Sequence, residues 1–236
     1  MTVGGMFAGG LWIASTAALR YYRGVNETIS SLLLNYIAIA ILNFLIVGPL
    51  RDPESLNNPA THAIGDVNTL GNIAGTSIHW GLGFGLVACA LLWLTMRHTV
   101  FGFAVDIVGG NRRAAQLSGL PVGRLVILTS FIGGAMAGLA GMVEVVAVHG
   151  RANSALHAGY GYEGILIAFI ARHHPLAIVP AAVLFGGIRA ASGLMQRDHG
   201  LPDATGLVMQ GIIFVVILAA EQFYGRWSVR PIRGAV

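Results

Sequence analysis

Long apolar runs separated by short polar segments dominate the chain. Six of them are long enough, or nearly so, to cross the roughly 30 Å hydrocarbon layer of a membrane as helices. They cover about residues 3–19, 29–48, 80–96, 125–148, 176–195 and 205–224. A seventh run, 164–171, is short and is either a half-helix or a crossing extended by residues 159–162. The pattern predicts an all-α, polytopic bundle of about six to seven transmembrane helices.

Composition supports a membrane environment. Hydrophobic residues make up 55% of the 236 residues and charged residues only 10%, whereas a typical water-soluble domain has about 25% charged residues. A fold in water could not bury so much apolar surface. We therefore expect a single domain, 1–236, embedded in membrane lipid.

The cationic residues indicate an orientation. All fourteen are arginine, and they are scattered among the apolar runs and not gathered on one face, which argues against nucleic-acid binding. If 164–171 crosses the membrane, ten arginines fall in one set of alternate loops and three in the other, and Arg189 lies inside a predicted span. This positive-inside asymmetry predicts a multi-pass protein of the cytoplasmic (inner) membrane, with the 97–124 loop and the C-terminus in the cytoplasm. If 164–171 does not cross, the later loops change sides.

Enzymatic chemistry finds little support in the sequence. A P-loop needs a lysine to reach the phosphates, and the chain contains no lysine, so it cannot hydrolyse ATP by that route. The eight histidines form no zinc-protease motif, and Cys89 is the only cysteine. We expect no enzymatic activity in this chain, no metal site and no cofactor.

Small residues at spacings of three and four predict close packing between helices. The residues with this spacing are Gly134, Ala137, Gly138 and Gly141, the pair Gly81 and Gly85, and the pair Gly187 and Ala191.

Polar residues inside predicted spans are candidates for a translocation path. Asn35 and Asn43 lie about two turns apart on roughly one face of the 29–48 helix, and Tyr36 is nearby. Amides in hydrocarbon need partners, so they form hydrogen bonds between helices or line a route for a hydroxyl-rich solute. Glu144, near the end of the 125–148 span, is either a structural group that pairs or reaches the interface, or part of that route.

The 97–124 loop contains a short predicted helix. Asn111 is suited to cap a helix over 112–117, and Gly119 and Pro121 are suited to end it. Because spans flank this helix, it either lies at the membrane interface or docks into a groove of another protein.

This loop resembles the cytoplasmic coupling helix of ABC importer permeases of the ribose, branched-chain amino acid and nucleoside type. In those permeases a glycine and an asparagine precede paired alanines and a later glycine. Gly110, Asn111, Ala114, Ala115 and Gly119 stand at these places. The resemblance implies that these five residues, with Arg112 and Arg113, contact an ATPase.

Two further stretches resemble the nucleoside and simple-sugar permeases of this type. The first is 26–38, Asn-Glu-Thr-Ile-Ser-Ser-Leu-Leu-Leu-Asn-Tyr-Ile-Ala, and the second is 159–168, followed by Pro175 and the Phe-Gly-Gly of 185–187. Such permeases usually carry about three more spans before the first stretch. The chain would therefore correspond to the C-terminal two-thirds of the longer family fold.

The resemblance implies a permease for nucleosides or related simple sugars. Its partners would be an ABC ATPase subunit, a second related permease subunit and an extracytoplasmic substrate-binding lipoprotein. A branched-chain amino acid or ribose permease is the alternative within the same type. A gradient-driven secondary carrier or channel is the alternative from another class.

Overall fold

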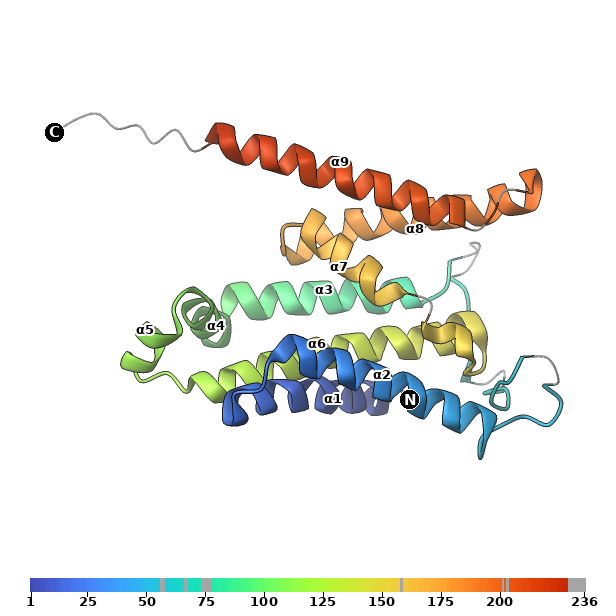
Figure 1. Ribbon diagram of the computed structural model, residues 1–236, viewed down its shortest axis with the longest axis horizontal. Helices are drawn as coiled ribbons and strands as arrows, with labels where there is room; N and C mark the ends of the chain where they lie inside the picture. The colour runs from blue at the N-terminus through green and yellow to red at the C-terminus, as the bar shows by residue number, and fades with distance from the viewer. Residues whose placement is uncertain are drawn as a thin grey trace. The chain divides into compact units, whose positions relative to one another are not determined.

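Helices dominate the computed structural model (Figure 1), which describes residues 1–236 except 56–57, 66–67, 74–77, 158, 201, 203 and 229–236. The described residues contain no β-strand, only isolated bridges such as that between Arg51 and Thr61. The predicted all-α membrane fold is confirmed. Two compact units, Met1–Ala158 and Gly159–Val236, are called here the first and second unit. The expectation of a single domain stays a prediction.

The first unit begins with two long helices joined by a short turn. Helix α1 (Thr2–Arg23) ends at Gly24, whose left-handed φ of 67° lets its N–H reach the carbonyls of the last turn. Helix α2 (Glu27–Val47) begins at Asn26, whose side chain accepts hydrogen bonds from the N–H groups of Thr28 and Ile29. These two caps fix the position of the turn between the helices.

The rest of the first unit consists of four α-helices and two short helices of other kinds among the described residues. They are α3 (Gly81–His98), α4 (Val100–Gly110), α5 (Arg112–Leu117), α6 (Val122–Val143), the π-helix η2 (Glu144–His149) and the 3-10 helix η3 (Ser154–His157). Helix α4 was not predicted, because its residues fall in the predicted 97–124 loop, where a helix was expected only over 112–117. Its 11 residues rise only about 16 Å, too little to cross a membrane.

Glycines bring α1 and α6 into direct backbone contact. A Cβ added to Gly138 would collide with the carbonyl oxygen of Gly5, and one added to Gly134 would collide with that of Gly9. The two glycines on α1, Gly5 and Gly9, are four residues apart, and so are Gly134 and Gly138 on α6. Small residues at this spacing are typical of close helix crossings within membranes. The packing role predicted for Gly134 and Gly138 is confirmed.

The other small residues behave less uniformly. A Cβ on Gly81 would meet the side chain of Val143, so close packing is confirmed there. A Cβ on Gly85, Gly141 or Gly187 would meet nothing within 4 Å among the described residues. The described residues therefore give these three no close neighbour, and for them close packing stays a prediction.

Five helical segments are long and apolar enough to span a membrane. They are Thr2–Arg23, Glu27–Val47, Gly81–His98, Val122–His149 and Pro175–His199, and they match the first five predicted spans. The sixth predicted span falls on α9 (Ala204–Ser228), whose described apolar part, Ala204–Ile217, is shorter.

The second unit consists of α7 (Tyr160–Ile170), α8 (Pro175–His199) and α9, which contact one another. The 11 residues of α7 cover about half the thickness of a hydrocarbon layer. Arg172 and His173 take left-handed φ angles after it, and Pro175 begins α8. By its length alone α7 matches the half-helix, one of the two alternatives expected for 164–171.

Candidate functional site

Helix α5 is a short, separately capped helix between α4 and α6. The Oδ1 atom of Asn111 accepts hydrogen bonds from the N–H groups of Arg113 and Ala114, at 3.0 and 3.1 Å. Gly119 takes a left-handed φ of 77°, and its N–H donates to the carbonyl of Gln116. The helix predicted over 112–117 is confirmed, with its cap at Asn111 and its end at Gly119.

Ala115 packs α5 against α4 and α6. Its side chain is 0% exposed, and it packs with Ala104 and Val108 of α4 and with Val122 and Leu125 of α6. A displacement of α5 would therefore carry α4 and α6 with it, because close-packed side chains transmit movement.

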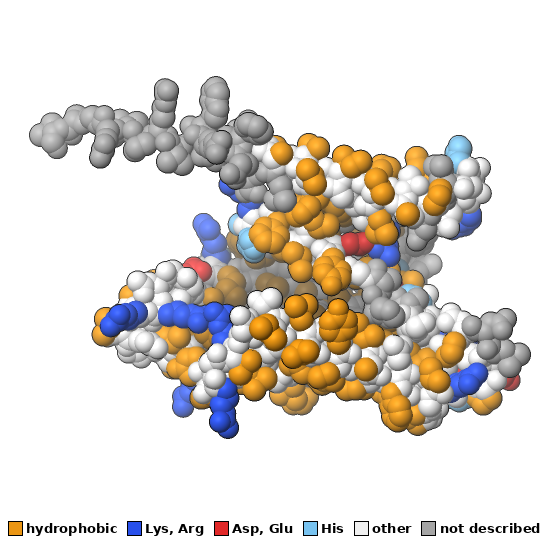
Figure 2. Space-filling view, in the orientation of Figure 1, with side chains coloured by type: hydrophobic (Ala, Val, Ile, Leu, Met, Phe, Trp, Pro, Cys, Tyr) orange, Lys and Arg blue, Asp and Glu red, His pale blue; other side chains and the backbone are white. Residues whose placement is uncertain are grey.

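The remaining surface of α5 is exposed within the part of the chain that the structure describes. Gly110, Asn111, Arg113, Ala114 and Gly119 are all exposed, and Leu117 at the end of the helix is 86% exposed. Arginine side chains gather at this end of the first unit (Figure 2). An exposed leucine beside exposed arginines is a suitable surface for insertion into a partner's groove. Of the seven predicted contact residues, Ala115 alone is buried.

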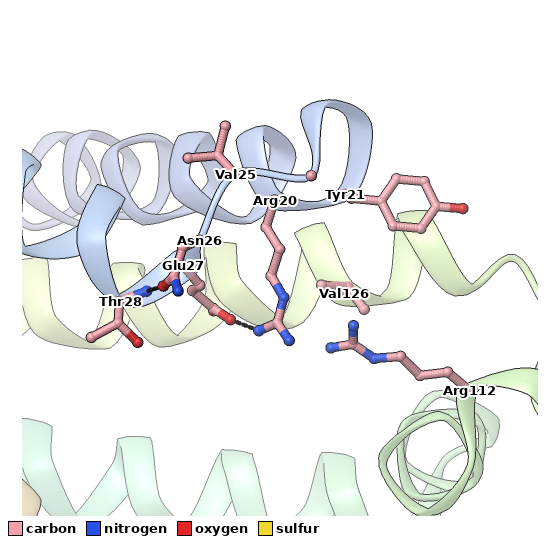
Figure 3. A pocket seen from close by; sticks show the side chains of 9 residues that line it. Arg20, Tyr21, Val25, Asn26, Glu27, Thr28, Arg112 and Val126 are labelled. Carbon is pink, nitrogen blue, oxygen red and sulfur yellow. Dashed lines mark hydrogen bonds and ion pairs between the residues drawn. The ribbon is translucent and has the colours of Figure 1, made fainter.

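Arg112 points away from this exposed surface into a cavity of about 640 Å³. The cavity is lined by Arg20 and Tyr21 of α1, the turn to α2, the start of α2, Arg112 and Val126. Arg20 forms an ion pair with Glu27, whereas no ion pair or hydrogen bond is found for Arg112 within the described part of the chain (Figure 3). In the sequence, Arg20 counts only as one of the loop arginines that indicate the orientation. Its proximity to Arg112 could not be predicted, because the two residues are far apart in the chain.

The polar residues of α2 lie at its surface. Asn35 is exposed, Tyr36 is 68% exposed and Asn43 is half-buried. Within the described residues, none of these three side chains forms a hydrogen bond to another side chain or to the backbone. An unpaired amide or hydroxyl facing lipid would be costly, so this face of α2 suits a wet path or a polar partner.

Glu144 lies apart from these residues, at the start of η2. Its side chain is half-buried, and the Nδ1 atom of His149 lies 3.5 Å from its Oε1. No hydrogen bond or ion pair joins Glu144 to Asn35, Tyr36 or Asn43 among the residues described. Within these residues, no three or more His, Cys, Asp or Glu side chains come together in a group that could hold a metal ion.

The second unit contains an ion pair within its helices. Arg189 of α8 pairs with Glu163 of α7, and its guanidinium also lies 4.4 Å from the centre of the Tyr160 ring. Sequence reasoning noted Arg189 as a charge inside a span but missed its partner, which lies 26 residues away. The pair joins the half-length helix α7 to α8.

Loss of this pair should destabilise the second unit. Arg189→Met leaves the Glu163 carboxylate unpaired, and we expect a loss of about 2 kcal/mol in the free energy of unfolding. The double variant Arg189→Met/Glu163→Gln should regain part of the loss, because no charge remains unpaired. Thermal unfolding in detergent measures both, with Arg197→Met on the same helix as control. Equal stability of the Arg189 and Arg197 variants would contradict the structural role of the pair.

Comparison with known proteins gives one family and several relatives. A family model described as "Branched-chain amino acid transport system / permease component" matches residues 1–218. A glucose ABC transporter permease protein of Haloferax volcanii is 29% identical over 94% of this chain and 61% of its own length. A guanosine ABC transporter permease protein of Bacillus subtilis is 29% identical over 92% of this chain and 62% of its own length.

A nucleoside ABC transporter permease protein of Lactococcus lactis is 25% identical over 84% of this chain and 57% of its own length. The chain thus spans about three-fifths of the length of the curated relatives that it matches. No solved structure matches it.

Proposed function

This chain belongs to the family of permease components described for branched-chain amino acid transport systems, and we propose that it serves as a permease subunit of an ABC importer for nucleosides or related simple sugars. The observation that carries the proposal is α5. It is capped by Asn111, anchored by the buried Ala115 and exposes Leu117 at its end. A firmly packed helix with an exposed apolar end of this kind is suited to contact a cytoplasmic ATPase subunit that moves it.

The motor is a separate ABC ATPase subunit in this proposal, because the chain has no lysine for a P-loop. Closure of the ATPase moves α5, and the packing of Ala115 against α4 and α6 passes the movement on. The glycine contacts of α6 with α1 then carry it to the helix that precedes α2. Rigid-body movement of this kind opens a path to one side of the membrane at a time.

The solute path lies along the polar face of α2 in this proposal. Asn35, Tyr36 and Asn43 offer hydrogen-bond donors and acceptors without net charge, which matches a solute with many hydroxyl groups. A second related permease subunit faces this surface across the path, and an extracytoplasmic lipoprotein delivers the solute. The names of the relatives, which mention glucose, guanosine and nucleosides, support this class of solute.

Substitutions on this face should reduce uptake. Tyr36→Phe/Asn43→Leu removes two hydrogen-bonding groups from the path, and we expect nucleoside uptake to fall about tenfold. Uptake of guanosine, ribose and leucine by cells with the complete transporter measures the effect. Ile37→Val on the same helix is the control, since Ile37 carries no polar group. Unchanged guanosine uptake in the double variant, or a preference for leucine over guanosine, would contradict the solute assignment.

A further inference from the structure

Two cavities of the first unit lie on the same three helices but differ in chemistry. The first is the cavity around Arg20, Glu27 and Arg112 described above. The second, of about 460 Å³, is apolar and is lined by residues that include Gly9 of α1, Ala38 and Leu45 of α2 and Ala137 of α6. One cavity is thus charged and the other is suited to hydrocarbon.

The residues of the two cavities are in register along the helices. Gly9 and Arg20 on α1, Ala38 and Glu27 on α2, and Ala137 and Val126 on α6 are each eleven residues apart. Eleven residues are about three helical turns, so each pair shares one face of its helix, and the rise between its members is about 16 Å. This is close to half of a hydrocarbon layer, about 15 Å. A ligand with a charged end in the first cavity and an apolar end in the second would span one leaflet.

The charged cavity is suited to an anion. Arg20 and Arg112 both reach into it, and among the described residues only Arg20 has a carboxylate partner, Glu27 (Figure 3). Two guanidinium groups and one carboxylate leave one positive charge without a counter-ion. The Asn26 side chain already occupies N–H groups of the first turn of α2, so the arginines supply the attraction. Guanidinium groups bind phosphate oxygens through paired hydrogen bonds.

We propose that these two cavities bind one anionic phospholipid, with its phosphate between Arg20 and Arg112 and one acyl chain along α2 as far as Ala38 and Leu45. The charge of the first cavity, the apolar lining of the second and their shared register all match this ligand. At about 100° per residue, Tyr36 and Asn43 lie on nearly the opposite side of α2 from Ala38. The lipid therefore leaves Tyr36 and Asn43 free, whereas Asn35, about 60° around α2 from Ala38, borders the apolar cavity. The lipid also joins α5 to the turn between α1 and α2.

The headgroup part of the proposal is tested by titrating the purified full chain with lipids and counting bound molecules by native mass spectrometry. Phosphatidylglycerol should bind at least fivefold more tightly than phosphatidylcholine with the same acyl chains. Arg112→Gln should weaken phosphatidylglycerol binding about fivefold, which is the effect of one arginine near an anionic lipid surface. Arg97→Gln, which removes a charge that lines neither cavity, should leave it unchanged. Equal binding of the two lipids, or equal effects of the two substitutions, would overturn the proposal.

The acyl-chain part needs a separate variant and a separate probe. Ala38→Trp fills the apolar cavity and should weaken phosphatidylglycerol binding several-fold, whereas Ile37→Trp, whose side chain does not line the cavity, should not. Inorganic phosphate should bind far more weakly than the lipid and should respond to Arg112→Gln but not to Ala38→Trp. Phosphate binding as tight as lipid binding would identify a free-anion site and overturn the proposal. The proposal would also be overturned if Ala38→Trp changed the oligomeric mass of the protein and left lipid binding unaltered. The apolar cavity would then be an interface between chains.

Discussion

Gly138→Leu should separate α1 from α6 and leave little folded protein. A Cβ at this position would collide with the carbonyl oxygen of Gly5, and the next contacts are also backbone atoms. A side-chain neighbour could rotate away, but backbone can yield only if a whole helix moves. Overpacking in a well-packed core costs about 1–3 kcal/mol, and we expect this substitution to reach the upper end of that range or exceed it.

Gly141→Leu is the matched control for this prediction. It makes the same change on the same helix, one turn further on, where an added Cβ meets nothing within 4 Å in the described part of the chain. Thermal unfolding in detergent and the yield of monodisperse protein measure the difference between the two variants. If Gly138→Leu were as stable as Gly141→Leu, the close crossing of α1 and α6 would be refuted.

Leu117→Asp should abolish ATP-driven uptake while the protein still inserts and folds. Leu117 is 86% exposed, so its replacement removes no packing within the chain. In the proposed complex the leucine fills a groove of the ATPase, where a buried carboxylate would have no partner. Loss of one central interface residue weakens binding by about 2–4 kcal/mol, so we expect uptake to fall about 30- to 900-fold.

The control for this prediction is Val100→Asp. Val100 is 83% exposed and lies at the start of α4, so the same charge is introduced at another exposed aliphatic residue nearby. Uptake, membrane content and unfolding temperature should be measured for both variants. Normal uptake by the Leu117→Asp variant would remove the main support for α5 as the contact with the ATPase. Gly119→Arg is a less direct test, because it also strains a left-handed residue with a φ of 77°.

Features of the fold that are set by local sequence could be predicted. The membrane spans could be predicted from the long apolar runs, and the start of α5 from the capping residue Asn111. Both features depend on residues that are close together in the chain. Helix α4 could not be predicted in the same way, since its apolar run follows α3 after the single residue Thr99. The difference between the exposed Ala114 and the buried Ala115 also escaped prediction, because six residues are too few to show which face of a helix is buried.

Features that depend on distant partners required the structure. The spacing of Gly134 and Gly138 indicated a close contact, but nothing in it identified Gly5 and Gly9 as the other side. The pairing of Arg189 with Glu163 and the approach of Arg112 to Arg20 likewise join separate elements. Sequence patterns contain the periodicity of a helix but not the identity of its neighbour.

The side of the membrane from which α5 can be reached is the most direct test of the central claim that a cytoplasmic ATPase moves this chain through α5. In a Cys89→Ser background, Leu117→Cys introduces a single exposed thiol at the end of α5. A maleimide that cannot cross membranes should label this thiol in inside-out vesicles and not in intact cells, and the ATPase bound to the vesicles should protect it. Labelling from outside intact cells would contradict the orientation and the contact with the ATPase together.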